Sequence, residues 1–270
     1  MRAPAVRALG LMSAHGAAAE ASPGAAGPLG ARVLSLGRPA PRGERSRRAT
    51  RECLLALAAV AAMLEDAKAA PPAIAGERTA LLYATAAGYA ASNRSFIEGG
   101  GSLHFAYTAP AVVPAEVAIE FGLTGPYAVF VGGPPATLRA IWHAAILLDT
   151  GACDRALVLA VETFLECVDL YAHARRLTRW PLVETAGCVW LEPGRGRLSF
   201  ESRRGRARAH ARAAGTGELF GCEPLVALDR WRRGLAPASL ELRGSWRGEH
   251  ARLVWSGSAV PATVAANSSS

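Results

Sequence analysis

Apolar positions in the first two thirds of the chain switch between strand spacing and helical spacing. Short and nearly continuous apolar runs, typical of buried strands, occur at residues 6–11, 78–86, 127–131 and 155–162. Leucine, isoleucine and alanine recur at helical spacing over residues 49–69, 115–123 and 135–150. This succession predicts an α/β fold with a parallel sheet covered by helices.

The pattern changes after Glu184. Segments that predict strands occupy residues 187–193, 197–211, 239–246 and 250–255, and one helical segment occupies residues 224–233. Neither an internal repeat nor a linker divides the chain, so we expect a single domain over residues 1–258. Residues 259–270, AVPATVAANSSS, are small and uncharged, and we expect them to be disordered.

Composition narrows the class of protein. The 270 residues are 51% hydrophobic, which is enough to bury a substantial core. Five scattered cysteines form no C-x-x-C pair, so we expect no disulfide framework and a reducing, cytoplasmic compartment. The longest apolar run, residues 53–64, is too short to cross a bilayer. The Ala-rich N-terminus is interrupted by polar residues where a signal peptide would be apolar.

The net charge of +8 comes mostly from arginine, and seven arginines lie within residues 195–212. Three interpretations of this run stay open: a solvated strand face, a contact with an acidic carrier protein or partner, and a nucleic-acid contact. Aromatic residues are not regularly interleaved with these arginines, so we do not expect nucleic-acid binding.

Residues 126–141, PYAVFVGGPPATLRAI, combine a strand, two glycines and the start of a helix. Backbone N–H groups and the helix dipole stabilise an anion at such a junction, and many enzymes place a nucleophile there. Here the junction holds Pro134 and Pro135, and proline suits the first position of a helix because it has no N–H to leave unpaired. The sequence thus predicts the geometry of a nucleophile's site without the nucleophile.

Other candidate side chains are explained as well by structural roles. Cys153 is predicted to be an ordinary turn or core thiol, and His143 an interior or interface residue of an Ala-rich helix. The histidines lack zinc-ligand spacing, so we expect no metal site and no cofactor. A solvated loop explains Glu162, Glu166 and Asp169 as well as acid–base chemistry does.

Residues 140–162, AIWHAAILLDTGACDRALVLAVE, resemble a helix and the following strand of the β-ketoacyl synthase branch of the thiolase superfamily. Three further segments resemble that family in matching order: VRALGLMSAHG at 6–16, PAEVAIEFGLTGP at 114–126 and ETAGCVWLE at 184–192. The resemblance spans residues 6–192 and implies the N-terminal half of a thiolase-like fold. Residues 193–258 would form a shortened, degenerate C-terminal part, giving a reduced thiolase-like fold with apolar faces for a partner to cover.

The resemblance also implies that this chain has no catalytic residue of its own. Aligning the helix places Pro134 where the family has its nucleophilic cysteine. Residues 213–224, AAGTGELFGCEP, resemble the loop that carries the family's first active-site histidine, with Ala214 at that position.

A truncated, nucleophile-free relative of this kind resembles the chain-length-factor subunits of bacterial type II systems, especially the short ones associated with aryl polyene pigments. This implies a heterodimer with an active β-ketoacyl synthase in fatty acid or polyketide biosynthesis, in which this chain helps to shape the acyl pocket. Two alternatives stay open: a free-standing acyl-thioester enzyme with an unrecognised nucleophile, and a solitary thiolase-fold scaffold or binding protein.

Two groups of residues would make the contacts of such a heterodimer. The strand that pairs the subunits would include Val129, Phe130 and Val131. An acyl carrier protein would contact the arginine run through Arg203, Arg204, Arg206 and Arg208.

Overall fold

The structure is a computed structural model of the chain. It describes residues 1–14, 33–41, 43–44, 47, 49–99, 101, 105–167, 181–205, 217–234 and 239–256. The tail predicted at residues 259–270 lies outside this set.

The described residues form the following strands and helices. The strands are β1 (Arg2–Ser13), β2 (Val33–Leu34), β3 (Thr79–Thr85), β4 (Tyr127–Val131), β5 (Arg155–Glu162), β6 (Leu182–Val183), β7 (Thr185–Arg204), β8 (Ser239–Trp246) and β9 (Glu249–Ser256). The α-helices are α1 (Arg51–Ala67), α2 (Ala90–Ile97), α4 (Val112–Phe121), α5 (Pro134–Asp149) and α7 (Glu223–Arg232). Short 3₁₀ helices are η2 (Pro71–Ala73), η3 (Ala106–Thr108), η4 (Leu165–Cys167) and η5 (Phe220–Cys222).

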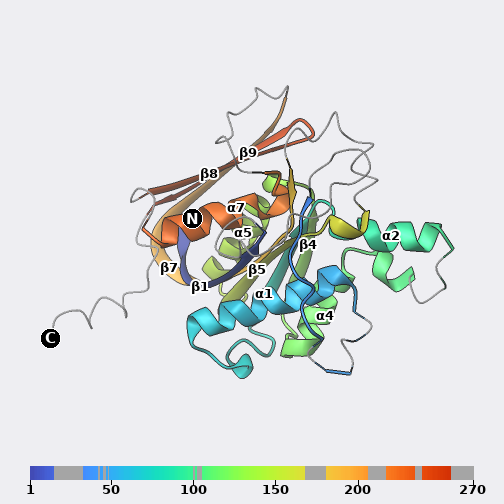
Figure 1. The fold of residues 1–270 in the computed structure, drawn as a ribbon. Helices are drawn as coiled ribbons and strands as arrows, with labels where there is room; N and C mark the ends of the chain where they lie inside the picture. The colour runs from blue at the N-terminus through green and yellow to red at the C-terminus, as the bar shows by residue number, and fades with distance from the viewer. Residues whose placement is uncertain are drawn as a thin grey trace.

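One mixed sheet organises the molecule, with the strand order β4-β3-β5-β7-β9-β8 and with β1 beside β7 (Figure 1). Strands β4, β3 and β5 are parallel, which confirms the prediction for that part. The expectation of a parallel sheet is wrong beyond β5, because β7 pairs antiparallel with β5, β1 and β9. The turn Arg247-Gly248 has positive φ at both residues, and it joins β8 to β9 as an antiparallel hairpin.

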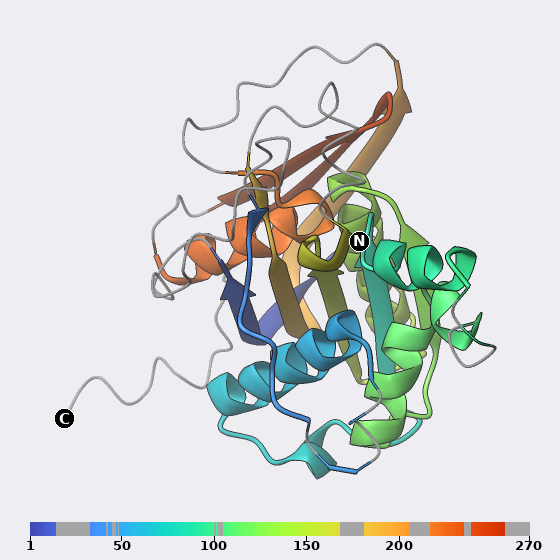
Figure 2. The ribbon, with the colours of Figure 1, turned by 45° about the vertical axis from the view of Figure 1, so that its right-hand side comes forward.

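The central strands are buried on both faces. Along β3, Leu82 faces the side of α5, while Leu81 and Tyr83 face the side of α1 and α4. Both views place α1 and α4 at one end of the molecule and β8 and β9 at the other (Figures 1 and 2). This double burial explains why the strand sequences are continuously apolar rather than alternating.

The curved sheet packs around helix α5. Its apolar side chains pack on β3 and β5 and also on β8 and β9. Trp142 of α5 stacks on Phe200 of β7, with ring centroids 5.7 Å apart. The predicted apolar face is confirmed by four buried residues, Leu138, Ile141, Ala145 and Leu148.

Strand β7 is continuous, where the sequence predicts two strands separated near Pro193 and Gly194. The pairing register with β1 shifts there, from Ala5 opposite Glu192 to Ala3 opposite Gly196. Such a bulge lets a proline, which has no N–H to donate, remain within a strand. A Cβ atom on Gly194 would lie 2.4 Å from the carbonyl oxygen of Ala3, so glycine is needed for this close approach.

The outer face of β7, β9 and β8 is polar in the described residues. Leu253 and Trp255 of β9 point toward α5, so the alternate residues His250 and Arg252 point away from it. Figure 1 shows the labelled helices on the opposite side of these strands. The expectation that the shortened C-terminal part leaves apolar faces is wrong for this face, because charged and polar side chains occupy it apart from the half-buried Val254. The helices in the described ranges include none with the length and apolar content needed to span a membrane.

The packing of α5 predicts a large effect of the substitution Ile141→Asp. Ile141 is fully buried, so an aspartate would place an unpaired carboxylate in the core and should lower the free energy of unfolding by about 3 kcal/mol or more. His143→Asp is the matched control, since His143 is exposed on the same helix and the change should stay within about 0.5 kcal/mol. Thermal and urea unfolding measure both; equal curves for Ile141→Asp and the parent would show that α5 is misplaced.

Candidate functional site at the start of helix α5

Pro134 is the first residue of α5, as the sequence predicts. β4 ends at Val131, and the N–H of Gly132 donates to the carbonyl oxygen of Thr85 at 2.8 Å, which ties the turn to the end of β3. Gly132 has φ 155°, in the region that glycine adopts readily. The strand, turn and helix start expected of a nucleophile's site are therefore present, with proline at the helix start.

Strand β8 covers this helix start. A Cβ atom on Gly133 would lie 2.5 Å from the Trp246 ring, and one on Gly244 would lie 2.7 Å from Cβ of Pro134. Both positions therefore need glycine because another segment occupies the space. The N-terminal turn of α5 is enclosed, and Pro134 and Pro135 are buried.

Three aromatic rings extend this cover. Trp246 lies edge-on to Phe220 of η5, with centroids 4.9 Å apart, and Phe220 lies edge-on to Phe164 at 5.3 Å. Arg247 lies above the Trp246 ring at 5.7 Å, within the range of a cation–π contact. We call Phe164, Phe220 and Trp246 the aromatic plug. It fills the region between the start of α5 and the end of β5.

Beneath the plug, the carboxyl group of Glu162 accepts hydrogen bonds from three backbone N–H groups. Ala86 and Gly221 donate to Oε1 at 2.7 Å and 2.9 Å, and Ala87 donates to Oε2 at 2.9 Å. Thr137 Oγ1, in the first turn of α5, donates to the carbonyl oxygen of Gly221 at 2.5 Å. Glu162 therefore holds the end of β5, the loop after β3 and η5 together, and Thr137 adds α5 to this assembly.

Burial dominates the ionisation of Glu162. Loss of solvation raises the pKa of this carboxyl to about 8, against the opposing effect of its backbone N–H donors. The expectation of a solvated loop is wrong for Glu162, which is fully buried, and right for Glu166, which is exposed. Asp169 lies outside the described residues. A single acidic residue that ends a wholly apolar strand is the sequence signal that could have identified Glu162.

A buried ion pair supports the neighbouring loop. Arg51 Nη2 lies 2.6 Å from Glu184 Oε2, and both side chains are almost inaccessible. Glu184 also accepts hydrogen bonds from the N–H groups of Leu36, Phe164 and Leu165, each at 2.9 Å. The pair therefore positions Phe164 of the plug, and no local pattern in the sequence predicts it.

The thiols of the described cysteines offer no nucleophile. Cys53, Cys153, Cys188 and Cys222 are free and buried. Desolvation raises the pKa of Cys53 to about 12 and raises the pKa of the other three above the ordinary value. The prediction that Cys153 is a turn or core thiol is confirmed. The side chain of Cys167 lies outside the described set.

The predicted interface residues lie on β4, which pairs only with β3 among the described strands. Val131 is 57% exposed, whereas Val129 is half-buried against the α1 and α4 side of the core. Phe130 packs toward the α5 side and lies edge-on to His143, with ring centroids 6.0 Å apart. His143 is exposed rather than interior, so its role as an interface residue stays a prediction.

The structure describes two of the four arginines predicted to contact a carrier protein. Arg203 and Arg204 are exposed at the end of β7, opposite His250 and Glu249 of β9. Ala214, Arg206 and Arg208 lie outside the described residues. Within the described ranges, no group of three or more histidine, cysteine, aspartate or glutamate residues is placed to hold a metal ion.

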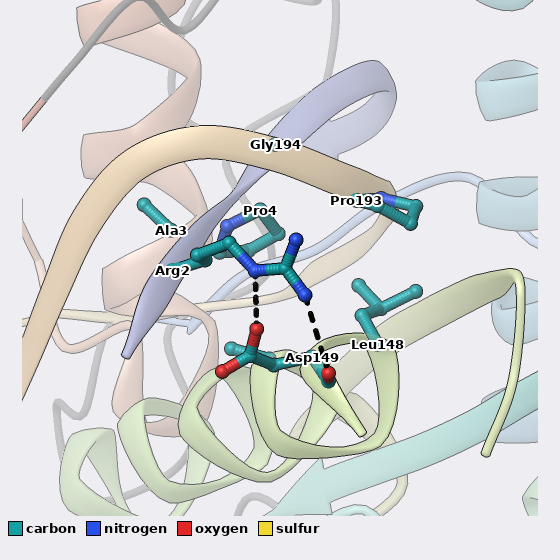
Figure 3. A pocket seen from close by; sticks show the side chains of 8 residues that line it. Arg2, Ala3, Pro4, Leu148, Asp149, Pro193 and Gly194 are labelled. Carbon is teal, nitrogen blue, oxygen red and sulfur yellow. Dashed lines mark hydrogen bonds and ion pairs between the residues drawn. The ribbon is translucent and has the colours of Figure 1, made fainter. Parts of the chain in front are cut away.

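A pocket at the C-terminal end of α5 is too small for a ligand. It lies between the start of β1, the end of α5 and the bulge of β7, and Arg2 Nε lies 2.5 Å from Asp149 Oδ1 across it (Figure 3). Its volume is about 10 Å³, which is room for no more than one water molecule.

Glu162 predicts a pH dependence of stability. Because its pKa is raised from 4.5 to about 8 in the folded chain, the unfolded chain loses this proton first as the pH rises. The contribution of Glu162 is therefore complete below pH 4.5 and is lost as the pH rises toward 8, with a slope of at most about 1.4 kcal/mol per pH unit. Glu162→Gln should remove this slope, and should lower stability at low pH because an amide has only one oxygen to accept hydrogen bonds.

Urea unfolding at several pH values between 4.5 and 8 measures the effect. Glu77→Gln is the control, since it removes an exposed carboxyl that contributes to the pKa shift of neither Glu162 nor Glu52, and it should leave the slope unchanged. Burial also raises the pKa of Glu52, so the informative quantity is the difference between each variant and the parent. Parallel pH profiles for Glu162→Gln and the parent would contradict the buried, protonated carboxyl.

Comparisons with known proteins agree with this fold. The family model described as "Beta-ketoacyl synthase, N-terminal domain" matches residues 40–178, just over half of the 270 residues. No curated protein matches the chain by sequence.

Three solved structures illustrate the similarity. The ishigamide ketosynthase/chain length factor is 15% identical, with a TM-score of 0.72 over 94% of this chain and 99% of that one. The ketosynthase ApeO in complex with its chain length factor ApeC, from Xenorhabdus doucetiae, is 14% identical, with a TM-score of 0.59 over 95% and 100%. AntDE:AntF, a type II PKS acyl-carrier protein in complex with its ketosynthase, is 14% identical, with a TM-score of 0.73 over 95% and 99%.

At these identities the structural matches show the fold, while the sequence model shows the family. The chain therefore belongs to the β-ketoacyl synthase N-terminal domain family and has its mixed α/β, thiolase-like fold.

Proposed function

We propose that this chain is a non-catalytic, cytoplasmic partner of an active β-ketoacyl synthase, similar to a chain length factor, in type II fatty acid or polyketide biosynthesis of the aryl polyene kind. It would form one domain over residues 1–258, stabilise the heterodimer and help to shape the acyl pocket. The observation that carries the proposal is the start of α5, where Pro134 occupies the helix start and Trp246 covers it.

The chemistry of the described thiols supports a non-catalytic role. A ketosynthase needs an accessible thiolate to accept an acyl group. The four cysteines whose side chains are described are buried with raised pKa values, so each is neutral and inaccessible at neutral pH. None of the four lies at the first residue of α5.

The edge strand β4 supports pairing with a second subunit. Its sequence, YAVFV, carries no charge, and Tyr127 and Val131 are 68% and 57% exposed. Exposed edge strands of monomeric proteins usually carry charges or prolines that block pairing. An apolar edge that pairs with no strand other than β3 in the described ranges is suited to a partner that continues the sheet.

Solved relatives give the proposal a precedent. Two of the similar structures are described as a ketosynthase/chain length factor and as a ketosynthase in complex with its chain length factor. A third includes an acyl-carrier protein. We assign Arg203, Arg204, Arg206 and Arg208 to the contact with such a carrier, whose acidic surface would be opposite in charge.

The proposal predicts that the purified chain is not acylated by an acyl-carrier thioester. Pro134→Cys should also remain unacylated, because position 134 is buried against Gly244 of β8 and the resemblance puts Ala214 in place of the family's histidine. Intact-protein mass spectrometry measures acyl transfer, with an active ketosynthase as the positive control. Stoichiometric acylation of any of the five native cysteines would instead support a free-standing acyl-thioester enzyme.

A second prediction concerns the edge of the sheet. Val131→Lys should abolish co-purification with an active ketosynthase, because it places a charge in the pairing edge. Val131 is a better test position than Val129 because Val131 is exposed, whereas the side chain of Val129 also contacts the core. Ser239→Lys is the matched control, since it adds the same charge to β8 at the opposite end of the strand order.

Co-expression followed by affinity purification and light scattering measures the pairing. We expect the lone chain to aggregate, the pair to form a heterodimer, and the interface to bury more than about 2,000 Å² in total. A stable monomer that gains nothing from the ketosynthase, or full co-purification of Val131→Lys, would favour a solitary scaffold.

A further inference from the structure

The polar outer face of β7, β9 and β8 carries two rows of residues that run across the three strands. One row is Glu201, Arg252 and Arg243, which are direct cross-strand neighbours. The next row is Arg203, His250 and Ser245, two residues further along each strand. Residues two apart along a strand point to the same side, so both rows face away from α5.

The first row brings two like charges together. Arg243 and Arg252 are directly opposite each other, an arrangement that costs stability unless an anion lies between them. Glu241 supplies that anion: Oε1 accepts from Arg252 Nε at 2.8 Å and from Arg243 Nε, and Oε2 accepts from Arg252 Nη2 at 3.1 Å. These guanidinium groups lower the pKa of Glu241 to about 2. This part of the face is therefore already organised around one oxyanion.

Among the described residues, no carboxylate pairs with the second row in this way. Arg203 is exposed and forms no ion pair with any residue in the described part of the chain. Ser245 Oγ and His250 Nδ1 lie 2.8 Å apart, and His250 Nε2 faces the carbonyl oxygen of Gly205 at 3.3 Å, which holds the imidazole in place.

Both rows line one cavity of about 350 Å³. Its lining includes three arginines, Arg203, Arg243 and Arg252, together with His250 and Ser245, against one carboxylate, Glu201. That volume is within the range of small-molecule sites and exceeds what a single inorganic anion fills. Arginine binds phosphate oxygens in a bidentate manner. Arg203 and Arg252 are diagonal neighbours on the adjacent strands β7 and β9, within reach of a common ligand, and Arg243 lies directly opposite Arg252 on β8.

We propose that this cavity binds a phosphate ester, with Arg203 as the main contact and Arg243 and Ser245 beside it. The phosphate supplies the negative charge that the second row lacks, and the organic part of the ester occupies the rest of the cavity. The ester is either a free small molecule or the phosphate-linked arm of a carrier protein. Binding at this outer face does not depend on the pairing of β4 with a ketosynthase.

Isothermal titration with inorganic phosphate and with pantetheine 4′-phosphate tests the site at constant ionic strength. We expect both to bind, the ester more tightly, and Arg203→Gln to weaken both by about tenfold or more. Arg195→Gln is the matched control, since it removes the same charge from an exposed position of the same strand and should change affinity less than twofold. Ser245→Ala is a second variant, which removes a hydroxyl group from the proposed site and leaves the charge of the site unchanged.

Apo and holo forms of an acyl carrier protein distinguish the two sources of the phosphate. Tighter binding of the holo form, lost in Arg203→Gln, identifies the carrier's arm; binding of the free ester alone identifies a small molecule. Either result supports the phosphate site. Absence of phosphate and ester binding, or equal losses in Arg203→Gln and Arg195→Gln, overturns it, and neither outcome bears on co-purification with the ketosynthase.

Discussion

The buried carboxyl group of Glu162 is the contact on which the arrangement of the site depends. Three segments that are distant in sequence, the end of β5, the loop after β3 and η5, meet at its two oxygen atoms. A buried carboxyl without partners would cost several kcal/mol, so each of these backbone N–H groups must keep its place. Through the bond from Thr137 to Gly221, the same contact fixes the first turn of α5.

That constraint explains how the start of α5 is held in place with proline at its first position. Strand, turn and helix are held by Glu162, by the bond between Gly132 and Thr85, and by the packing of Trp246 on Gly133. None of these contacts needs a nucleophile at position 134. Proline there satisfies the backbone of the helix start, and the aromatic plug fills the space in front of it.

The sequence predicted what depends on local periodicity. The strand expected at 78–86 is β3, and the helix expected at 135–150 is α5, with bounds that differ by at most one residue at each end. It did not predict the contacts that make the site. Gly221 donates to Glu162 across 59 residues, and Trp246 meets Gly133 from a different part of the sheet. Such contacts depend on how β7 carries β8 and β9 over α5, which no local pattern encodes.

The continuity of β7 also explains how β8 and β9 reach α5. One long strand pairs with β5 at its start and with β9 at its end, so β9 and β8 extend the same sheet over α5. Leu253 and Trp255 bury the inner side, and a polar outer side then faces solvent. The large hydrophobic side chains that are exposed in the described residues all lie between 96 and 165, so β4 carries some of them and β8 and β9 carry none. Since the polar face lies on β8 and β9, at the other end of the strand order from β4, the charged surface is separate from the edge at β4, as the proposed pairing and the proposed phosphate site both require.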